Sequence, residues 1–373
     1  LFEELIRRFS EQSNETAWEH YTPREVIQLM VNVLFEPDAE ILKKEHIIKT
    51  VYDPCCGTGG MLSVGKEHIL QHINEKASVF VYGQELNPIT YAICKADMLI
   101  KWEDADRIRW VDKDHTIAST LSTDQFLDLK FDYILANPPY GVDWKKDKES
   151  VELEADRGFA GRFGAGLPRS SDGQLLFLQH MLSKMRNPSE GGARVGVVFN
   201  GSPLFTGDAG GGESEIRRWV CENDYLETII ALPDQLFYNT GISTYIWILS
   251  NRKEAKRKNK VQMIDARNFY KKMRKSLGSK RNEISEDDIK NIQTLYQNFT
   301  ENEQSKIFKT TDLAYRQITV ERPLRMKYDF TTAEQMKKLY DILGIKDAGI
   351  REEELWISMS ERIDTIGTPH EAL

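Results

Sequence analysis

The sequence FDYILANPPYG, residues 131–141, decides the predicted fold. Its first half is a short apolar run, which predicts a buried strand. The strand cannot continue beyond Ala136, because neither Pro138 nor Pro139 can donate a backbone hydrogen bond within a sheet. An amide, two rigid prolines and an aromatic ring therefore follow the carboxyl end of a strand, which is where ligands bind in open α/β sheets.

These residues are suited to holding an amino group. The prolines fix their own φ angles, so the Asn137 amide and the Tyr140 ring are held in place. The Asn137 side-chain oxygen and the Pro138 carbonyl could accept both hydrogens of an exocyclic amine, with Tyr140 stacking beneath the ring that carries it. We therefore predict a catalytic group of Asn137, Pro138, Pro139 and Tyr140. The plainer alternative is an ordinary proline-rich turn, which the full tetrad after an apolar run disfavours.

A glycine-rich loop follows an earlier strand. Residues 47–52 predict a buried strand, residues 53–60 (DPCCGTGG) a loop, and Met61 onward a helix, which together resemble the start of a nucleotide-binding unit. Glycines let backbone N–H groups approach a ligand closely. The leading Asp53 would repel a pyrophosphate and suits a cationic group instead, such as the amino group of a methionine moiety. The loop matches neither the dinucleotide fingerprint nor the phosphate-binding loop.

Acidic residues follow the next two strands. Glu85 comes after the strand 78–82 and lies 26 residues beyond Gly59, close to the offset of about 20 expected for a carboxylate that binds ribose hydroxyls. The alternative for Glu85 is a solvated carboxylate in a turn. The strand 107–111 is followed directly by Asp112, and Asp114 is the other candidate for the acidic residue after this strand. Earlier in the chain, Thr22 is predicted to cap a helix, with Pro23 at its first position and Glu25 completing a capping box.

The later part of the chain continues the alternation of helices and strands. Residues 174–185, 287–299 and 332–343 predict helices, residues 193–199 and 225–231 predict buried strands, and residues 243–249 and 260–264 predict an antiparallel hairpin with a basic tip. Residues 142–172 show little hydrophobic periodicity, and a loop this long is uncommon in a compact domain. It is a candidate DNA-contacting lid, or a mobile surface insertion, and its cations are Lys145, Lys146, Lys148, Arg157, Arg162 and Arg169.

Composition limits the possible functions. The 373 residues carry a net charge of −8, which is the wrong sign for a protein that binds nucleic acid over its whole surface. Residues 251–281 hold thirteen Lys and Arg against two acids, a local +11, so the remainder carries −19. DNA affinity is therefore expected to be local or supplied by a partner. No apolar run approaches the ~18 residues of a membrane span. The four cysteines lack metal-site spacing and indicate a reducing cytoplasm, with no metal expected.

Several motifs together resemble one family. The tetrad resembles that of methyltransferases acting on adenine N6 or on the amide of glutamine, and the loop resembles their S-adenosylmethionine loop. The whole, over residues 21–265, resembles the modification subunit of type I restriction–modification systems, a DNA adenine N6-methyltransferase. The motifs appear in this order: YTP from Tyr21, DPCCGTGGM from Asp53, GQELNP from Gly83, LANPPYGV from Leu135, SDGQLLFLQH from Ser171, FNGSPLFTG from Phe199 and ALPDQLFYNTGI from Ala231.

The resemblance implies a fold and a division of the site. The fold would be doubly wound α/β, with a mostly parallel, seven-stranded sheet of the S-adenosylmethionine-dependent methyltransferase type that closes with an antiparallel hairpin, and then a helical C-terminal tail. Asn137, Pro138, Pro139 and Tyr140 would act on the target adenine. The cofactor S-adenosylmethionine would be bound by Tyr21, Thr22, Asp53, Cys55, Gly57, Thr58, Gly59, Gly60, Glu85 and Asp112, the last accepting hydrogens from the cofactor's adenine. The strand before Asp112 lacks the usual final glycine.

The resemblance also implies domains and partners. Residues 1–20 would be the remnant of an N-terminal helical region, residues 21–270 the methyltransferase domain, and residues 271–373 a helical tail that binds a partner. A specificity subunit would read the DNA sequence, with two modification subunits bound to it and a restriction subunit able to join. The alternatives are a solitary DNA adenine methyltransferase, a protein-glutamine methyltransferase and a non-catalytic scaffold subunit.

Overall fold

The computed structural model describes residues 22–110, 119–238, 241–315, 318 and 320. The chain divides into two compact units, residues 1–317 and 318–373, and the helices and strands below belong to the first. Three residues of the predicted site, Tyr21, Asp112 and the alternative Asp114, lie outside the described residues. The same holds for the predicted N-terminal helical remnant.

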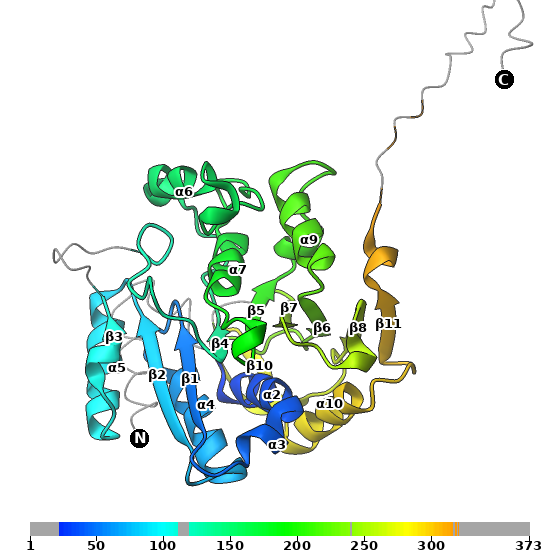
Figure 1. Cartoon of the computed structure of the whole chain (residues 1–373). Helices are drawn as coiled ribbons and strands as arrows, with labels where there is room; N and C mark the ends of the chain where they lie inside the picture. The colour runs from blue at the N-terminus through cyan, green and yellow to red at the C-terminus, as the bar shows by residue number, and fades with distance from the viewer. Residues whose placement is uncertain (1–21, 111–118, 239–240, 316–317, 319, 321–373) are drawn as a thin grey trace, which may run out of the picture. The chain divides into compact units, whose positions relative to one another are not determined.

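A mixed sheet of nine strands forms the centre of the described part of the chain (Figure 1). Across the sheet the order is β11-β8-β6-β7-β5-β4-β1-β2-β3. Seven strands run in one direction, while β7 and β11 run against their neighbours. The mostly parallel α/β sheet is confirmed, with nine strands instead of seven. The strands are β1 (Ile48–Asp53), β2 (Ser78–Gln84), β3 (Ile108–Arg109), β4 (Tyr133–Ala136), β5 (Arg194–Asn200), β6 (Leu226–Ala231), β7 (Thr244–Ser250), β8 (Lys260–Asp265) and β11 (Ser305–Lys309).

The predicted hairpin between residues 243–249 and 260–264 is wrong. β6 lies between these strands, antiparallel to β7 and parallel to β8. β7 is inserted between β5 and β6 and is antiparallel to both. Nearly every residue of β6 and β7 is buried. Because buried backbone groups need hydrogen-bond partners on both edges, these two apolar strands take interior positions and the less buried β8 lies outside them.

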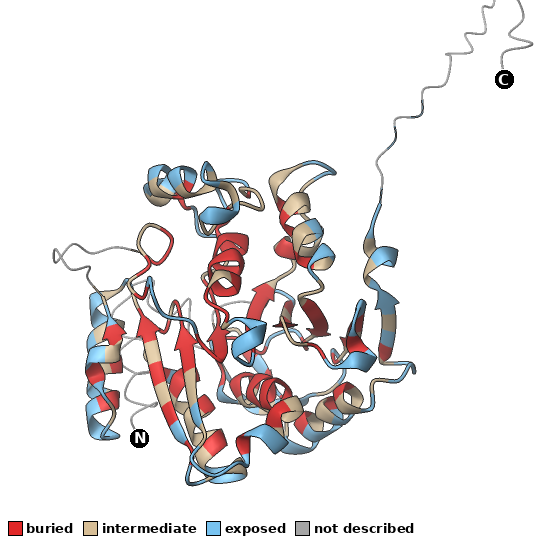
Figure 2. Cartoon of the chain, viewed as in Figure 1, coloured by how far each residue is buried: buried red, intermediate tan, exposed pale blue. Residues whose placement is uncertain are grey.

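Helices cover both faces of the sheet, as alternate residues of its strands indicate. Val51 of β1 and Leu135 of β4 belong to one apolar core, whereas Tyr52 and Ile134 belong to a second. Successive side chains of a strand point to opposite faces, so the two cores lie on opposite sides of the sheet. Figure 2 shows buried residues along the strands and the sheet-facing sides of the helices. The doubly wound arrangement is therefore confirmed.

The first core is completed by α2 (Arg24–Phe35), α4 (Gly60–His68), α5 (Pro88–Ile100) and α10 (Glu286–Asn298), and the second by α7 (Gln174–Ser183) and α9 (Gly212–Glu222). α4 continues as a π-helical turn, η3 (Ile69–Ile73). No helix among the described residues is long and apolar enough to cross a membrane. The other helical segments are η2 (Glu36–Asp38), α3 (Ala39–Leu42), η4 (Ala105–Arg107), η5 (Lys145–Asp147), α6 (Lys148–Ala155), η6 (Gly158–Ala160), η7 (Pro188–Glu190), α8 (Ser202–Phe205), η8 (Ala255–Arg257) and η9 (Thr310–Leu313).

The described part of the chain after residue 270 is less helical than predicted. β9 (Lys271–Leu277) and β10 (Lys280–Glu283) form a separate two-stranded antiparallel sheet, and β11 joins the edge of the main sheet. The helix predicted at residues 287–299 is confirmed as α10, which Ser285 and Asp288 open with a capping box. The helix predicted at residues 332–343 lies outside the described residues. Strand β9 was not predicted, because its polar sequence shows no alternation of apolar residues.

A buried ion pair joins the sheet to two helices. Arg194 of β5 donates to both carboxylate oxygens of Glu227 on β6, at 3.1 and 3.0 Å. Arg194 also donates to the Leu34 carbonyl at the end of α2, at 2.9 Å, and to the Tyr296 hydroxyl on α10, at 2.8 Å. Burial raises the pKa of Glu227, but the charges of Arg194 and Arg257 and the hydrogen bonds from Arg194 and Tyr296 together outweigh burial and hold that pKa below its usual value. Both charges are therefore compensated inside the protein.

We predict that Arg194→Met lowers the free energy of unfolding by about 3–5 kcal/mol, because it removes the cation that hydrogen-bonds to both oxygens of the buried Glu227 carboxylate and leaves only the longer contact with Arg257, at 3.9 Å, as an ion pair among the described residues. Urea unfolding followed by circular dichroism measures the loss. The control is Arg218→Met on α9, which breaks an exposed ion pair with Glu215 and should cost less than about 1 kcal/mol. A loss below about 1 kcal/mol for Arg194→Met would contradict the role given to this ion pair.

Candidate active site

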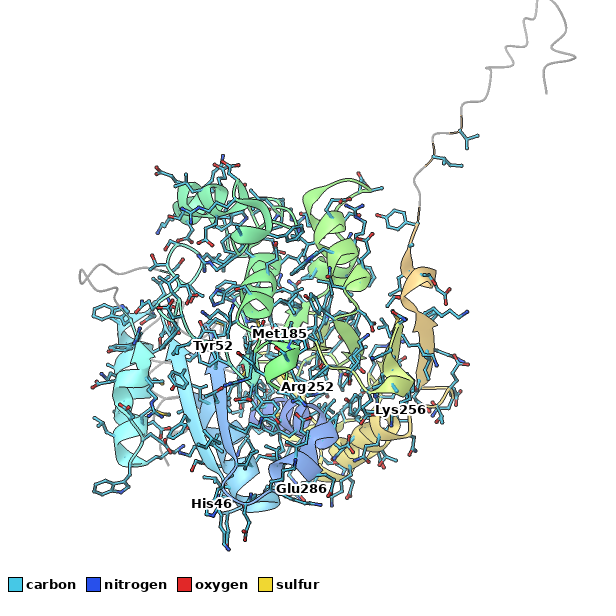
Figure 3. All side chains as sticks on the ribbon, in the orientation of Figure 1. His46, Tyr52, Met185, Arg252, Lys256 and Glu286 are labelled. Atoms are coloured by element: carbon cyan, nitrogen blue, oxygen red, sulfur yellow. The ribbon has the colours of Figure 1, made fainter. Side chains whose placement is uncertain are left out.

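The parallel register brings the predicted site residues to one edge of the sheet. Asp53, the last residue of β1, pairs with Gly83 of β2, and its neighbour Tyr52 pairs with Ile134 of β4. β1, β2 and β4 are parallel, so the residues that follow them emerge at the same edge. In Figure 3 His46, in the turn before β1, marks the opposite edge, at the amino ends of these strands.

The loop after β1 is held by backbone hydrogen bonds and by two glycines. The N–H of Cys56 donates to the Gln84 carbonyl at 3.0 Å, which fixes the loop to the end of β2. Gly57 and Gly59 have φ angles of 54° and 83°, in the left-handed region that favours glycine. Gly59 directly precedes α4, and a Cβ atom there would lie 2.7 Å from the Cys94 sulfur. The loop therefore requires glycine at residue 59 for both its conformation and its packing.

Two carboxylates lie beside this loop. Asp53 is buried, and its Oδ1 accepts from the Cys55 N–H at 3.0 Å. Burial raises the pKa of Asp53 to about 7, the Cys55 hydrogen bond opposes this effect, and the charge of Glu85 adds to it. Glu85 accepts from the N–H groups of Gly57 and Asn87, at 2.8 and 2.7 Å. A buried acid with a raised pKa gains most from a cationic ligand group, because such a group compensates its charge.

Asn137 is buried at the end of β4 and is oriented by two side chains. Its Nδ2 donates to the Thr22 hydroxyl at 2.9 Å, and its Oδ1 accepts from the Tyr140 hydroxyl. The Tyr140 ring meets Phe237 edge to face, with 6.4 Å between ring centroids. A carbonyl oxygen has two lone pairs, so Asn137 Oδ1 can still accept one further hydrogen. The Asn137 amide is thus held in one orientation with part of its acceptor capacity free.

The predicted cap at Thr22 is wrong. Helix α2 begins at Arg24, Pro23 occupies the cap position, and no side chain caps the helix. The Thr22 hydroxyl is engaged with Asn137 instead. Glu25, the other predicted member of the capping box, forms an ion pair with Lys280. The Thr22 hydroxyl therefore orients Asn137 and does not cap α2.

One pocket joins the loop after β1 to the residue after β4. Asp53, Cys55, Gly57, Thr58 and Gly60 line it together with Thr22 and Asn137, all residues of the predicted site. Gly59, Pro138, Pro139, Tyr140 and Glu85, also predicted for the site, are not among the residues that line this pocket, although Glu85 is bonded to Gly57. The sequence analysis missed five lining residues, which come from the start of α2, the loop and the first turns of α4: Arg24, Ile27, Cys56, Met61 and Val64.

The lining fits the cofactor that the sequence predicts. The buried Asp53 carboxylate suits a cationic amino group, and Ile27, Met61 and Val64 supply an apolar wall. Among the described residues, no group of three or more His, Cys, Asp or Glu could hold a metal ion. The pocket therefore has the chemistry of a site for an organic cation beside an amide that accepts hydrogens.

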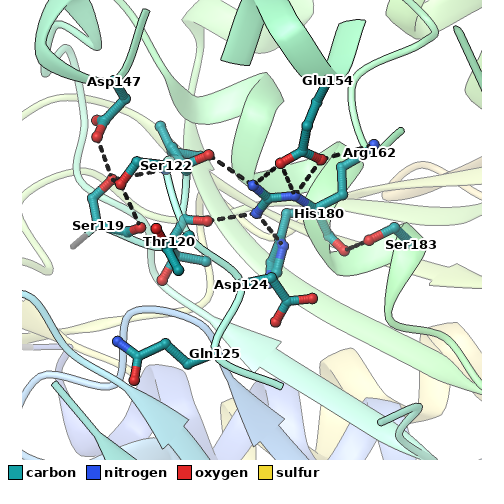
Figure 4. Close-up of polar contacts among 12 residues, drawn as sticks. Ser119, Thr120, Ser122, Asp124, Gln125, Asp147, Glu154, Arg162, His180 and Ser183 are labelled. Atoms are coloured by element: carbon teal, nitrogen blue, oxygen red, sulfur yellow. Dashed lines mark hydrogen bonds and ion pairs between the residues drawn. The ribbon is translucent and has the colours of Figure 1, made fainter. Parts of the chain in front are cut away.

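Residues 142–172 are anchored to the domain through Arg162 (Figure 4). The Arg162 guanidinium pairs with Glu154 and donates to the carbonyls of Thr120 and Leu121 at 2.6 and 2.8 Å. It also lies 3.1 Å from His180 Nδ1. Burial and the charge of Arg162 hold the pKa of His180 well below its usual value, so the imidazole is neutral. This segment contains α6 and contributes Trp144, Val151 and Phe163 to a third apolar cluster.

This anchoring corrects one expectation for the segment. Arg162, expected among the cations of a DNA-contacting lid, is nearly buried and fully engaged within the protein. The exposed cations are Lys145, Lys146, Lys148, Arg157 and Arg169. The Thr120 hydroxyl donates to the Pro54 carbonyl, so the network that holds the segment also touches the loop after β1. The segment therefore packs against the domain close to the loop after β1.

Comparison with known proteins gives three findings. The model of the N-6 DNA Methylase family matches residues 1–325. The "Type I restriction enzyme MjaIX methylase subunit" of Methanocaldococcus jannaschii is 26% identical over 374 residues, which is 100% of this chain and 60% of that protein. The crystal structure of the type I restriction-modification system methyltransferase subunit from Streptococcus thermophilus has a TM-score of 0.66 at 25% identity, covering 83% of this chain and 59% of that one. The chain thus spans about three fifths of the length of these relatives.

A left-handed backbone alone costs a residue with a Cβ atom about 1–2 kcal/mol. We predict that Gly59→Ala lowers the free energy of unfolding by more than this, because the added Cβ also meets the Cys94 sulfur. In a Cys94→Ala background the sulfur is absent, and the cost of Gly59→Ala should fall to that backbone contribution. Urea unfolding of the wild type, both single variants and the double variant gives the coupling. Equal costs in the two backgrounds would show that Gly59 does not pack against Cys94 as described.

Proposed function

The chain belongs to the N-6 DNA methylase family, and we propose that it transfers a methyl group from S-adenosylmethionine to N6 of adenine in double-stranded DNA, as the modification subunit of a type I restriction–modification complex. The observation that carries the proposal is the single pocket lined by Asp53, Gly57 and Asn137. A site for the methyl donor and a site for the acceptor amine must adjoin for direct transfer. The pocket meets this requirement within one domain.

The residues around Asn137 activate the acceptor. The N6 amine of adenine is a poor nucleophile, because its lone pair is delocalised into the ring. Asn137 Oδ1 and the Pro138 carbonyl accept the two amino hydrogens, which draws the nitrogen toward tetrahedral geometry and frees the lone pair. The bond from the Tyr140 hydroxyl and the bond to Thr22 hold the amide ready before the base arrives. Positioning and fixed dipoles then supply most of the rate.

Adenine N6 lies inside the duplex, so the target base must leave the stack before it can reach Asn137. Tyr140 is half-buried, and its ring can stack on the extruded base. Pro138 and Pro139 keep the backbone rigid between the amide and the ring. The tetrad therefore binds the base by its amino edge and by one face.

The opposite half of the pocket holds the cofactor, whose sulfonium supplies an electrophilic methyl group. Asp53 binds its amino group, and Glu85 binds the ribose hydroxyls while its hydrogen bond from Gly57 orders the loop. Cys55, Thr58, Gly59 and Gly60 shape the loop around it. Tyr21, Thr22 and Asp112 complete this assignment as the sequence proposes it.

The reading of DNA sequence falls to a partner in this proposal. A specificity subunit binds two modification subunits and selects the target, and a restriction subunit can join the complex. The type I names of the relatives support this assignment. The net charge of −8 agrees with a chain that contacts DNA over a limited surface.

We predict that Asn137→Ala lowers the rate of DNA methylation by about 10²–10³-fold, the usual cost of removing one preorganised polar group from an active site. Calorimetric affinity for S-adenosylmethionine should change by less than about threefold, because Asn137 contacts the acceptor. The methylation assay uses labelled S-adenosylmethionine, duplex DNA and the specificity subunit. Asn291→Ala, on the exposed side of α10, is the control and should leave both quantities unchanged. Full methylation by Asn137→Ala would contradict the proposed function.

We further predict that affinity for S-adenosylmethionine rises about eightfold from pH 6 to pH 7.5. Asp53 has a pKa of about 7 in the free protein, so the carboxylate that binds the cationic amino group is mostly protonated at pH 6 and mostly ionised at pH 7.5. Calorimetry across this range measures the change. Asp53→Asn should bind weakly at every pH and lose the dependence. A wild-type affinity that is flat in pH would contradict this role for Asp53.

A further inference from the structure

The antiparallel pair β9–β10, residues 271–283, carries a dense group of exposed cations, and we name it the basic ribbon. Its exposed cations are Lys271, Lys272, Arg274, Lys275 and Arg281. Lys271 and Lys275 point to one face of β9, while Lys272 and Arg274 point to the other, since side chains alternate along a strand. Glu283 is its one acidic residue. The basic ribbon therefore presents positive charge on both faces.

Within the described part of the chain, these cations have no bonded partner. Among the described residues, no hydrogen bond or ion pair engages the side chains of the five. The contrast with the neighbouring basic residues is sharp: Arg252 pairs with Asp38, Lys253 with Asp224 and Arg267 with Asp265. Five cations crowded within eleven residues repel one another. Such a concentration of exposed positive charge attracts an external polyanion.

The basic ribbon lies next to the catalytic residues. The Ser279 N–H donates to the Tyr238 carbonyl at 2.7 Å, and the Arg281 N–H donates to the Gln235 carbonyl at 2.9 Å. Lys280, the buried cation of the ribbon, donates to the Leu236 carbonyl at 3.1 Å. The segment so fastened contains Phe237, whose ring contacts Tyr140. The turn of the ribbon is therefore bonded to the residue after Phe237, and the Phe237 ring in turn contacts Tyr140.

A second anchor ties the basic ribbon to the other wall of the pocket. Lys280 forms an ion pair with Glu25 in the first turn of α2. Arg24, the first residue of α2, lines the pocket together with Thr22. The basic ribbon is thus fixed by both the Phe237 segment and α2, and its charge is presented at the carboxyl edge of the sheet.

We propose that the basic ribbon binds the phosphate backbone of the DNA duplex beside the extruded adenine. This inference rests on the proposed function, because it takes duplex DNA as the substrate. Lys and Arg side chains that neutralise phosphates release condensed counterions and so supply sequence-independent affinity. Outside residues 251–281 the chain carries −19, so it needs such a local cationic surface to hold DNA against its own repulsion. The basic ribbon positions the duplex, while the tetrad binds the base.

The test replaces four ribbon cations in one variant, Lys271→Gln, Lys272→Gln, Arg274→Gln and Lys275→Gln. Fluorescence anisotropy with a labelled 30-bp duplex measures the affinity of the full chain, in S-adenosylhomocysteine, from 50 to 200 mM salt. The expected slope of log affinity against log salt becomes shallower by about 3–4, since each lost phosphate contact removes about 0.9. At 50 mM salt the dissociation constant should rise at least tenfold.

The matched control removes four exposed lysines elsewhere, Lys44→Gln, Lys76→Gln, Lys290→Gln and Lys306→Gln. It lowers the net charge by the same amount, so it should reproduce the wild-type slope if the location of the charge matters. Thermal unfolding and S-adenosylmethionine binding of both variants should match the wild type, because all eight side chains are exposed.

A ribbon variant whose affinity and slope equal those of the control would overturn the proposal. So would a wild-type chain that binds S-adenosylmethionine but not the duplex at 50 mM salt. Failure of the proposed function is read separately, from methylation that persists in Asn137→Ala. The two results are therefore distinguishable, because the anisotropy assay does not depend on methyl transfer.

Discussion

The parallel pairing of β1 with both β2 and β4 is the constraint on which the site depends. It makes three strands end at one edge, so that a carboxylate at the end of β1, another after β2 and an amide after β4 converge there. Buried strands hold these ends rigidly, because their backbone groups are paired on both sides. A shift of one residue in β4 would turn Ile134 into the wrong core and move Asn137 away from the pocket.

Buried polar groups hold the surrounding layers to this sheet. Arg194 and Glu227 tie β5 and β6 to α2 and α10, whereas Arg162 ties the segment after the tetrad to α7 through His180. Each charge is compensated by a partner and by carbonyl groups, which is the condition under which a buried charge is tolerated. The Arg162 network reaches the loop after β1, because the Thr120 hydroxyl donates to the Pro54 carbonyl. Arg194 instead bonds to Leu34, at the end of α2 opposite to Thr22.

The sequence predicted those parts of the site whose signal is local. A strand, a glycine loop and a helix follow one another directly, so Asp53, Gly57 and Asn137 could be located from their neighbours alone. The errors arose where distant parts compete. Thr22 has the sequence of a helix cap, but Asn137 takes its hydroxyl. β7 and β8 are adjacent in sequence, yet burial on both faces inserts β7 between β5 and β6. Arg162 resembles a surface cation and is buried because Glu154 and two carbonyls surround it. β9 shows no alternation of apolar and polar residues, because none of its side chains is part of the three apolar clusters.

The central claim is that one pocket holds the methyl donor beside the amide that binds the acceptor. A crystal structure of this chain with S-adenosylhomocysteine tests it most directly. The account predicts that the ligand's amino group contacts the Asp53 carboxylate, that its ribose lies by Glu85, and that its sulfur faces Asn137. A ligand bound away from the loop at residues 53–60, or one whose sulfur points away from Asn137, would contradict the account.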